Sequence, residues 1–571
     1  MQRSPLVEEP TGSVLKSPPA QTADSPRFLG AGTVSPKVRS LAAAAAFLIS
    51  FVWFAATAEN SGIASVFCDP VSRIASQDEA VYGREAIEMA AHKNFLTPTY
   101  LGRYVLNKPP LMQILAAQSV RVFGASAWAV RFPSMVAAAA ITTLIFLLAW
   151  QMYSLTVATG AALLLASSHL FYVFARFCMT DMLLTLWLTL ALFVVALDPS
   201  LRRAHSLWIF SLACGAAILT KAAAGFMPIL ALLIHTALLP RDRRPGAPRL
   251  LTAIAGATAV ALPWHIYQLA VHTRWFMTEY VWTAHFLVGV AAPPQYSAEN
   301  HLVFYARRMF LMDPVLAVLA IAGLIPMARH WRHRVVSLAW TVTALLALLA
   351  FRYRSAYYLL PLLPAVALIA SESLALIARR RRWAPIATVL VCCSLKVASG
   401  SEVWGIPANL YSERPSASAL ERYCGLNRGN GLVLVDPDDE FYASILPIAR
   451  VRYALVRAEP PSPPIDYAWL GIWMPADRFA RFEQWAPLYR ERLRSYGLNS
   501  DWPVGTVIWA QSANEIESII ATHPESDFSI PTSMALRFWP ASHSVVPGGP
   551  GRVFLLSKVA RSYSEARPCR L

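Results

Sequence analysis

The sequence predicts an all-α polytopic membrane protein with a small soluble α/β domain at its C-terminal end. Of its 571 residues, 56% are hydrophobic and only 15% are charged, whereas soluble domains carry about 25% charged residues. Long apolar runs recur along the first 400 residues, and short arginine clusters separate many of them. A chain with this composition buries its apolar runs in a lipid bilayer.

Residues 1–39 are rich in Pro, Ser and Thr and poor in aromatic residues, which predicts a disordered tail. Lys37 and Arg39 then precede the first apolar run, 41–58. A signal peptide usually begins near residue 1 and ends in a small-residue cleavage site. We therefore expect this run to be a first transmembrane helix, held by its basic flank on the cytoplasmic side. The expected transmembrane domain covers residues 40–400.

Ten further runs approach the roughly 20 apolar residues that a membrane-spanning helix needs. They lie near 132–150, 155–173, 180–197, 206–220, 222–239, 250–270, 311–327, 335–351, 357–377 and 384–400. With the first run they make eleven expected spans, and the boundaries around 206–239 leave room for a miscount by one helix pair.

Arginine clusters set the expected orientation. Four loops between spans hold them: Arg202-Arg203, Arg241–Arg249, Arg329–Arg334 and Arg379–Arg382. When successive spans cross the membrane in alternating directions, all four loops fall on the same side. The positive-inside rule places them, with the N-terminal tail, in the cytoplasm. The other side is then external, and it receives the first external loop, 58–131, and residues 401–571. The same clusters account for most of the net charge of +16, so nucleic-acid binding is not predicted.

Residues 401–571 differ in composition from the rest of the chain. The runs Gly431–Val435 and Thr506–Trp509 have the character of strands, and the charged segment Asp477–Arg494 has that of a helix. We expect a small external α/β domain. Cys424 and Cys569 would lie in it and are candidates for a disulfide, although the sequence does not pair them.

The first external loop carries the most unusual segment, Asp78–Pro110. Apolar and charged residues alternate over Asp78–Ala91 as in an amphipathic helix, which would lie on the membrane surface and present carboxylates to water or to a lipid headgroup. Lys108 precedes two prolines, and this extends its backbone just ahead of a further apolar helix, Leu111–Phe123.

The predicted topology brings charged residues to the external ends of the helices. They are Asp78, Glu79, Lys108, Asp181, Lys221, His285, Arg352 and Arg354. Cations on this side run against the usual charge bias and suggest a bound anion, for which a lipid phosphate is the natural candidate beside a bilayer. Acidic residues next to it suggest acid–base chemistry or metal binding.

Each of these residues also has a structural explanation. Asp181 could complement a helix dipole, Lys221 could be a snorkelling anchor, and Arg352 and Arg354 could be interface anchors. Tyr357 and Tyr358 are typical of an aromatic belt, and His285 of a packed interfacial histidine. The whole set argues for a site, whereas no single member does.

Six short motifs occur in order: DEAVY from Asp78, KPP from Lys108, Arg176 ahead of Asp181, LTK ending at Lys221, Pro263-Trp264, and YYLLPLLP from Tyr357. In this order they resemble the GT-C glycosyltransferases, in particular the bacterial lipid A aminoarabinose transferases and related protein-mannosyltransferase-type enzymes. The resemblance covers about residues 40–375. It implies a bundle of about 11 to 13 transmembrane helices in a bacterial inner membrane.

The resemblance also implies roles for single residues. It makes Asp78 and Asp181 the catalytic pair, places Lys108 near the donor phosphate and matches Lys221 to the family's LTK lysine. The charge pattern at the external helix ends adds Arg352 and Arg354 to the cations expected at that phosphate. The residues expected to line the substrate and lipid groove are Glu79, Tyr82, Arg176, His285, Tyr357 and Tyr358.

Four positions depart from the family pattern. Val81 replaces an arginine, Ala222 replaces the glycine after the LTK lysine, Asn107 replaces a glutamate, and no arginine follows His285 closely. In some relatives that glutamate and histidine hold a metal, so a metal site is doubtful in this chain. The departures also leave the sugar and the acceptor open.

The function implied is transfer of a sugar from a polyprenyl-phosphate donor to an acceptor on the external face, which could be lipid A or lipopolysaccharide, another glycan or a protein, with inversion at the anomeric carbon. No nucleotide-binding glycine loop is evident, and no cofactor is expected with certainty. A transporter or flippase of a lipid-linked sugar would need the same basic patch. Transporters tend to be built from repeated halves, and the sequence shows no internal repeat, so an enzyme is favoured.

Overall fold

The computed structural model describes residues 35–56, 67–68, 75–76, 78–100, 103–291, 300–351 and 354–398, together with five short strands between 432 and 559. Residues 1–34 of the predicted tail, Arg352, Cys424, Cys569 and the segment Asp477–Arg494 lie outside the described residues. The last residues of that tail, 36–39, are helical and not disordered, because Ser35 caps a helix that begins at Pro36.

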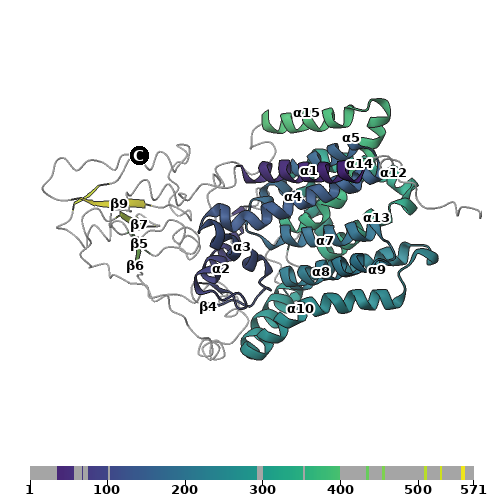
Figure 1. Ribbon diagram of the computed structural model, residues 1–571. Helices are drawn as coiled ribbons and strands as arrows, with labels where there is room; N and C mark the ends of the chain where they lie inside the picture. The colour runs from purple at the N-terminus through teal and green to yellow at the C-terminus, as the bar shows by residue number, and fades with distance from the viewer. Residues whose placement is uncertain are drawn as a thin grey trace, which may run out of the picture.

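Helices make up nearly all of the part before residue 400, and the long ones run side by side in one body (Figure 1). Their bounds are α1 Pro36–Ala55, α2 Asp78–His92, α3 Leu111–Phe123, α4 Ala127–Met152, α5 Leu155–Ala166, α6 His169–Ala175, α7 Thr180–Leu197, α8 Ala204–Lys221, α9 Met227–Leu238, α10 Ala247–Phe276, α11 His301–Met312, α12 Pro314–Arg329, α13 Val335–Ala350, α14 Leu363–Arg380 and α15 Ala384–Ala398. Short helical turns η1 Ala222–Phe226, η2 Arg241–Arg243, η4 Trp331–His333 and η5 Ala356–Leu362 join some of them, and the π-helix η3 Met277–Ala291 continues α10.

Each of the eleven predicted spans coincides with one of these helices or with a broken helix. By length and apolar composition, six helices of the described part are able to cross a membrane, or up to eight if each of two bent pairs counts as one span. That count treats Ala204–Leu238 as a single span of 35 residues, about twice the length a bilayer requires.

The chain reverses inside this 35-residue run. Ala222 has a φ of 43°, in the left-handed region that a residue with a side chain rarely adopts. A Cβ on Gly225 would lie 2.3 Å from Cα of Ile218, whereas residues seven apart in a straight helix are separated by about 10 Å. The two helices therefore form a hairpin, with Lys221 at its turn, as the two predicted spans 206–220 and 222–239 require.

Two other spans are broken, and a residue at one break contacts residues at the other. The axes of α5 and α6 differ by 67°, and those of α11 and α12 by 117°. Asp313, between α11 and α12, accepts hydrogen bonds from Ser168 Oγ at 2.8 Å and from the backbone N–H of His169, so it satisfies free N–H groups where α6 begins. This contact fixes α6, which leads directly into the loop before Asp181.

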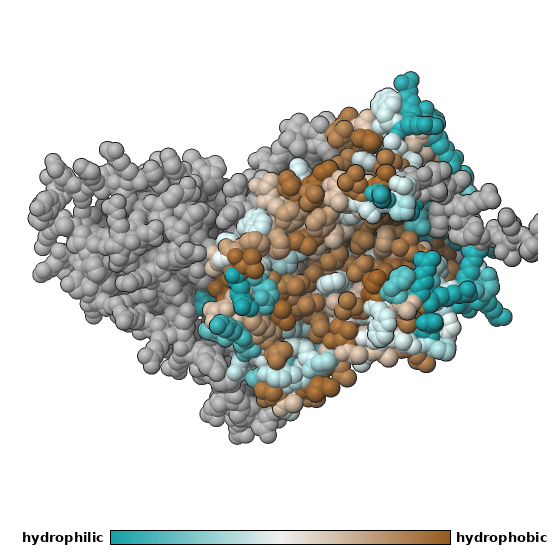
Figure 2. Space-filling model, in the orientation of Figure 1, coloured by the Kyte–Doolittle hydropathy of each residue, from teal (hydrophilic) through white to brown (hydrophobic). Residues whose placement is uncertain are grey.

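The surface of the helical body is apolar around its middle. Large hydrophobic side chains such as Leu41, Leu251 and Ile325 are 62 to 72% exposed. They contribute to a broad hydrophobic band with hydrophilic side chains toward both ends (Figure 2). An apolar belt of this kind faces lipid rather than water, and the chain is a multi-pass membrane protein, as predicted.

The first external loop folds largely as expected, with one correction. Helix α2 begins at Asp78 as predicted, a small hairpin follows with strands β3 Thr99–Tyr100 and β4 Arg103–Tyr104, and α3 has the predicted bounds. However, α2 packs against α3 and α4, and its glutamates Glu79, Glu85 and Glu88 are buried. The prediction that this helix presents its carboxylates to water or to a lipid headgroup is wrong for these three. Residues of the loop hold Glu85 and Glu88, and Arg131 on α4 and the backbone N–H of Cys178 hold Glu79.

Two segments carry strand pairs outside the helical body. Strands β1 Phe67–Cys68 and β2 Ala75–Ser76 pair antiparallel in the first external loop. Beyond residue 400, a mixed sheet has the order β6-β5-β7-β9-β8. Its strands are β5 Leu432–Val435, β6 Tyr453–Val456, β7 Val507–Ala510, β8 Asp527–Ser529 and β9 Phe554–Val559. The strands predicted in 431–435 and 506–509 are confirmed, and the α/β domain as a whole stays a prediction.

Candidate active site

The start of α2 and the Lys-Pro-Pro segment meet at one point. The ammonium of Lys108 lies 3.7 Å from Oδ2 of Asp78, donates a hydrogen bond to the phenol oxygen of Tyr82 and stands 4.8 Å above that ring. Asp78 and Tyr82 are four residues apart and share one face of the helix. The Asp78 side chain is 34% exposed and that of Lys108 26%, so both remain accessible to a ligand.

A second lysine–aspartate pair is much more buried. Lys221, at the turn between α8 and α9, donates a hydrogen bond to Oδ1 of Asp181 in the first turn of α7. The Asp181 side chain is only 2% exposed and that of Lys221 15%. Thr180 Oγ1 lies 3.3 Å from the other carboxylate oxygen.

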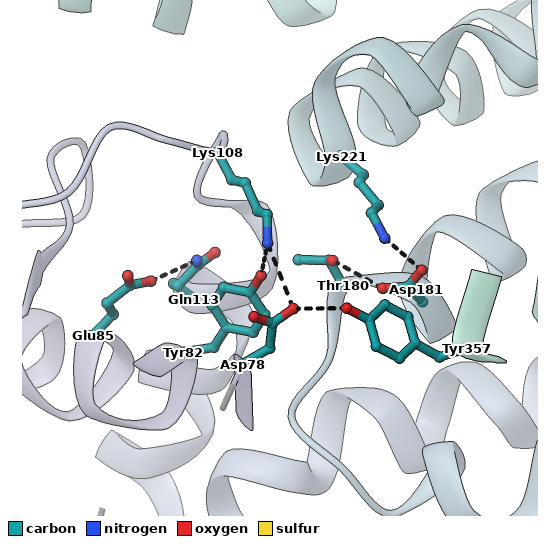
Figure 3. A network of polar contacts seen from close by, with 9 residues as sticks. All are labelled: Asp78, Tyr82, Glu85, Lys108, Gln113, Thr180, Asp181, Lys221 and Tyr357. Atoms are coloured by element: carbon teal, nitrogen blue, oxygen red, sulfur yellow. Dashed lines mark hydrogen bonds and ion pairs between the residues drawn. The ribbon is translucent and has the colours of Figure 1, made fainter. Parts of the chain in front are cut away.

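Tyr357 joins the two pairs (Figure 3). Its hydroxyl donates to Oδ2 of Asp78 at 3.4 Å, and its ring lies 5.5 Å from the ammonium of Lys221. The neighbouring ring of Tyr358 lies 4.5 Å from the same ammonium. Residues from five separate elements thus converge on one place: α2, the segment before α3, α7, the α8–α9 turn and η5.

Glu79 takes part in a separate buried set of contacts with Arg131 and the backbone of Cys178, which we call the clamp. It accepts two hydrogen bonds from the guanidinium of Arg131, at 2.7 and 3.0 Å, and one from the backbone N–H of Cys178 at 3.1 Å. The Glu79 side chain is 3% exposed and that of Arg131 0%. Because Glu79 adjoins Asp78 and Cys178 lies three residues before Asp181, the clamp fixes the two aspartates relative to each other.

Burial and pairing act in opposite directions on this clamp. Desolvation raises the pKa of the Glu79 carboxyl, while Arg131 and the Cys178 N–H lower it, since both favour the charged form. Burial and the neighbouring Asp78 raise the pKa of Tyr82 well above its usual value. Tyr82 therefore stays a neutral phenol, whose oxygen accepts a hydrogen bond from the Lys108 ammonium.

Two predicted groove residues and one predicted phosphate cation have contacts of their own. Arg176 stacks 4.2 Å above Tyr172, and its charge acts on Glu79. Arg354, predicted as a phosphate cation, is buried and lies 5.4 Å from the ring of Phe304. His285 packs on Tyr280 with the ring centroids 4.5 Å apart, and its Nδ1 lies 2.5 Å from the Tyr280 carbonyl, contacts that are typical of a packed residue.

Arg131 was missed from the sequence, although a signal for it existed. It lies in the first turns of α4, inside the otherwise apolar stretch Ala127–Ala140. An ionisable residue within a spanning helix points to the bundle interior and to a partner of opposite charge. The partner, Glu79, is 52 residues away, and sequence alone does not identify it.

Within the described part of the chain, no three of His, Cys, Asp and Glu come close enough to hold a metal ion. Asn107 and His285, at the positions where some relatives bind a metal, supply one imidazole and no carboxylate. These residues do not fit a metal site.

Comparisons with known proteins show which families this chain resembles. Residues 107–267 match the family model described as dolichyl-phosphate-mannose-protein mannosyltransferase. The undecaprenyl phosphate-α-4-amino-4-deoxy-L-arabinose arabinosyl transferase of Aeromonas salmonicida is 29% identical over 315 residues, which cover 52% of this chain and 55% of that protein. The enzyme of the same name from Pseudomonas aeruginosa is 30% identical, with the same coverage. The chain thus matches about half the length of these relatives.

The fold extends further than the sequence match. The crystal structure of ArnT from Cupriavidus metallidurans bound to undecaprenyl phosphate is 14% identical and superposes with a TM-score of 0.60, covering 92% of this chain and 99% of that one. The apo structure of the same protein gives 0.58. The predicted resemblance is therefore confirmed, and this chain has the fold of a GT-C glycosyltransferase of the ArnT type.

Proposed function

We propose that this protein is an integral membrane glycosyltransferase that moves a sugar from a polyprenyl-phosphate donor to an acceptor at the external face of the membrane. The observation that carries the proposal is the accessible Asp78–Lys108 pair beside the buried Asp181–Lys221 pair. Together they supply a base that can reach a substrate and two cations for a phosphate. Relatives named as undecaprenyl-phosphate-dependent arabinosyl transferases support the donor class.

The proposed reaction is one displacement at the anomeric carbon. The acceptor oxygen attacks this carbon, the bond from it to the phosphate oxygen breaks, and polyprenyl phosphate leaves with the bonding electrons. Lys108 and Lys221 stabilise the charge that develops on the phosphate. The carboxylate of Asp78 takes the proton of the acceptor. A single in-line attack inverts the anomeric centre.

The two aspartates take different parts in this proposal. Asp78 is exposed enough to meet an acceptor, and it contacts the hydroxyl of Tyr357 at 3.4 Å and the ammonium of Lys108 at 3.7 Å. Asp181 is buried and holds Lys221 directly. We therefore assign the base to Asp78 and the positioning of Lys221 to Asp181. Glu79 acts as a link between them and not as a groove residue.

Topology and acceptor complete the proposal. The N-terminal tail would be cytoplasmic, with the active site and residues 401–571 on the external side of a bacterial inner membrane. The acceptor would be lipid A or lipopolysaccharide, another envelope glycan or a protein. Val81, in place of the family arginine, adjoins Tyr82 of the site, so this position is a candidate for setting which acceptor binds.

Transfer by the purified protein in lipid nanodiscs tests the proposal. Undecaprenyl phosphate carrying a labelled pentose or hexose would be incubated with envelope glycolipids, and products would be separated and weighed by mass spectrometry. We expect free undecaprenyl phosphate and a glycosylated acceptor with the opposite anomeric configuration. Movement of the intact labelled lipid across a vesicle membrane, with no cleavage of the sugar, would instead indicate a transporter.

A further inference from the structure

The lysine proposed to meet the donor phosphate is carried on a short tether with two fixed ends. At one end the two prolines 109 and 110 lead into α3, whose first hydrogen bond runs from Ile114 N to Pro110 O at 2.8 Å. At the other end Leu106 is fully buried. Prolines restrict both their own backbone and that of the preceding residue. The position of the Lys108 ammonium therefore depends on how firmly Leu106 is held.

Leu106 is held by a residue far away in the sequence. Its backbone N–H donates to Oε2 of Glu279 at 2.9 Å, and the same carboxylate oxygen accepts from the indole N–H of Trp275. Glu279 is buried and lies in the first turn of the π-helix η3. A backbone N–H bonded to a carboxylate makes a charge-assisted hydrogen bond, which is stronger than one between neutral groups.

Packing around this bond makes the contact specific. Leu106 lies in a cluster with Trp264, Trp275 and Phe276 from the end of α10. On the same side, the carbonyl of Leu96 accepts from Trp264 Nε1 at 2.8 Å and from Gln268 Nε2 at 2.6 Å. Leu96 and Leu106 thus rest on the last turns of α10 and the first turn of η3, and Glu279 holds the chain two residues before Lys108.

From these contacts we infer that Glu279 is a positioning residue for Lys108, holding the 106–110 tether so that the ammonium reaches the donor phosphate. The inference rests on the proposed function, because it takes Lys108 to be the phosphate ligand. Because Glu279 holds the backbone of Leu106, two residues before Lys108, it is expected to act on donor affinity and not on the proton transfer.

The test measures the affinity of purified variants for undecaprenyl phosphate without a sugar, together with the donor KM and kcat of transfer. Glu279→Ala should weaken binding about tenfold, the effect of losing one hydrogen bond to a charged acceptor, and leave kcat at saturating donor within about twofold. Glu279→Gln should bind like the parent, because its amide oxygen accepts from the same two N–H groups.

A double variant separates positioning from general stability. If Glu279 acts through Lys108, the variant Lys108→Ala/Glu279→Ala should bind no more weakly than Lys108→Ala alone. Glu88→Ala is the matched control: it removes another buried carboxylate of this region, which accepts from Thr99 and pairs with Arg84. It should lower the Tm and leave the affinity unchanged. Should Glu279→Ala fail to fold, Glu279→Asp withdraws the acceptor by one methylene and should still weaken binding measurably.

Parent-like affinity in folded Glu279→Ala or Glu279→Asp, or additive losses in the double variant, would overturn the inference while leaving the proposed function intact. A Lys108→Ala variant that binds undecaprenyl phosphate as tightly as the parent would instead remove the phosphate contact from the proposed function, and the role of Glu279 with it.

Discussion

Replacing each aspartate of the site by asparagine should produce two different defects. Asp78→Asn keeps the size of the side chain and can still accept the hydroxyl hydrogen of Tyr357, which lies 3.4 Å away. It cannot take a proton at neutral pH. Lys108 retains its hydrogen bond to Tyr82, so the fold and the donor affinity should survive while turnover falls.

The expected size of each effect comes from burial. A positioned base contributes about 10²–10⁴-fold to rate, which is about 3 to 5 kcal/mol of activation free energy, and this should be the loss in kcat of Asp78→Asn. The Asp181 side chain is 2% exposed and pairs with a lysine that is 15% exposed. Removing one partner of a buried pair destabilises a protein by about 3–5 kcal/mol, because it leaves the other charge uncompensated. Asp181→Asn should therefore lower stability.

Three measurements on both variants distinguish these outcomes: the Tm in nanodiscs, the affinity for undecaprenyl phosphate, and single-turnover transfer of a labelled sugar. For Asp78→Asn we expect a parent-like Tm and affinity with a collapsed rate. For Asp181→Asn we expect a lowered Tm and a weakened affinity, since Lys221 loses the carboxylate that positions its ammonium. Near-normal transfer by Asp78→Asn, together with a collapsed rate in a stable Asp181→Asn, would mean that the base is the other aspartate.

Three further predictions concern the two lysines, the Glu79 clamp and the membrane topology. Lys108→Ala should weaken binding of undecaprenyl phosphate by about 30-fold, or about 2 kcal/mol, with an unchanged Tm; Lys221→Ala should weaken it less and also lower the Tm. Glu79→Gln should lower the Tm, because it leaves the charge of Arg131 buried without a counter-charge, which costs about 3–5 kcal/mol of stability. Equal stability of this variant and the parent would contradict the role of the Glu79–Arg131 clamp. Reporter fusions after Arg382 and at the C-terminus should report opposite sides of the membrane, whereas the same side for both would rule out the eleven-span topology.

The convergence of the site was predictable from the sequence because it depends on one-dimensional signals. Apolar run length predicts the spans, and arginine clusters give their phase. Once these are fixed, Asp78, Lys108, Asp181 and Lys221 fall at the same end of the bundle, and the structure brings them together. The fold was predictable from short motifs that occur in the order of the family, even though the sequence identity to the solved ArnT structure is only 14%.

Partner choice was not predictable, because it depends on how helices pack. Glu79 has the same local sequence context as Asp78, yet it turns to Arg131 on α4 while Asp78 faces the site. Glu279 contacts the backbone of Leu106, which leaves no trace in the side-chain pattern. The break between α5 and α6 likewise depends on Asp313, about 145 residues further along the chain.

The geometry also orders the two lysines in donor binding. Lys221 already has a carboxylate at hydrogen-bonding distance and two tyrosine rings around its ammonium, so a phosphate would share this ammonium with Asp181, which holds it in place. Lys108 donates a hydrogen bond to the phenol oxygen of Tyr82, with Asp78 farther off at 3.7 Å. A phosphate that recruits Lys108 therefore gains more of its charge, and by drawing this ammonium from Asp78 it frees the carboxylate to take the acceptor proton. Donor binding and activation of the base would then be one event, and this is why loss of Lys108 is expected to reduce donor affinity more than loss of Lys221.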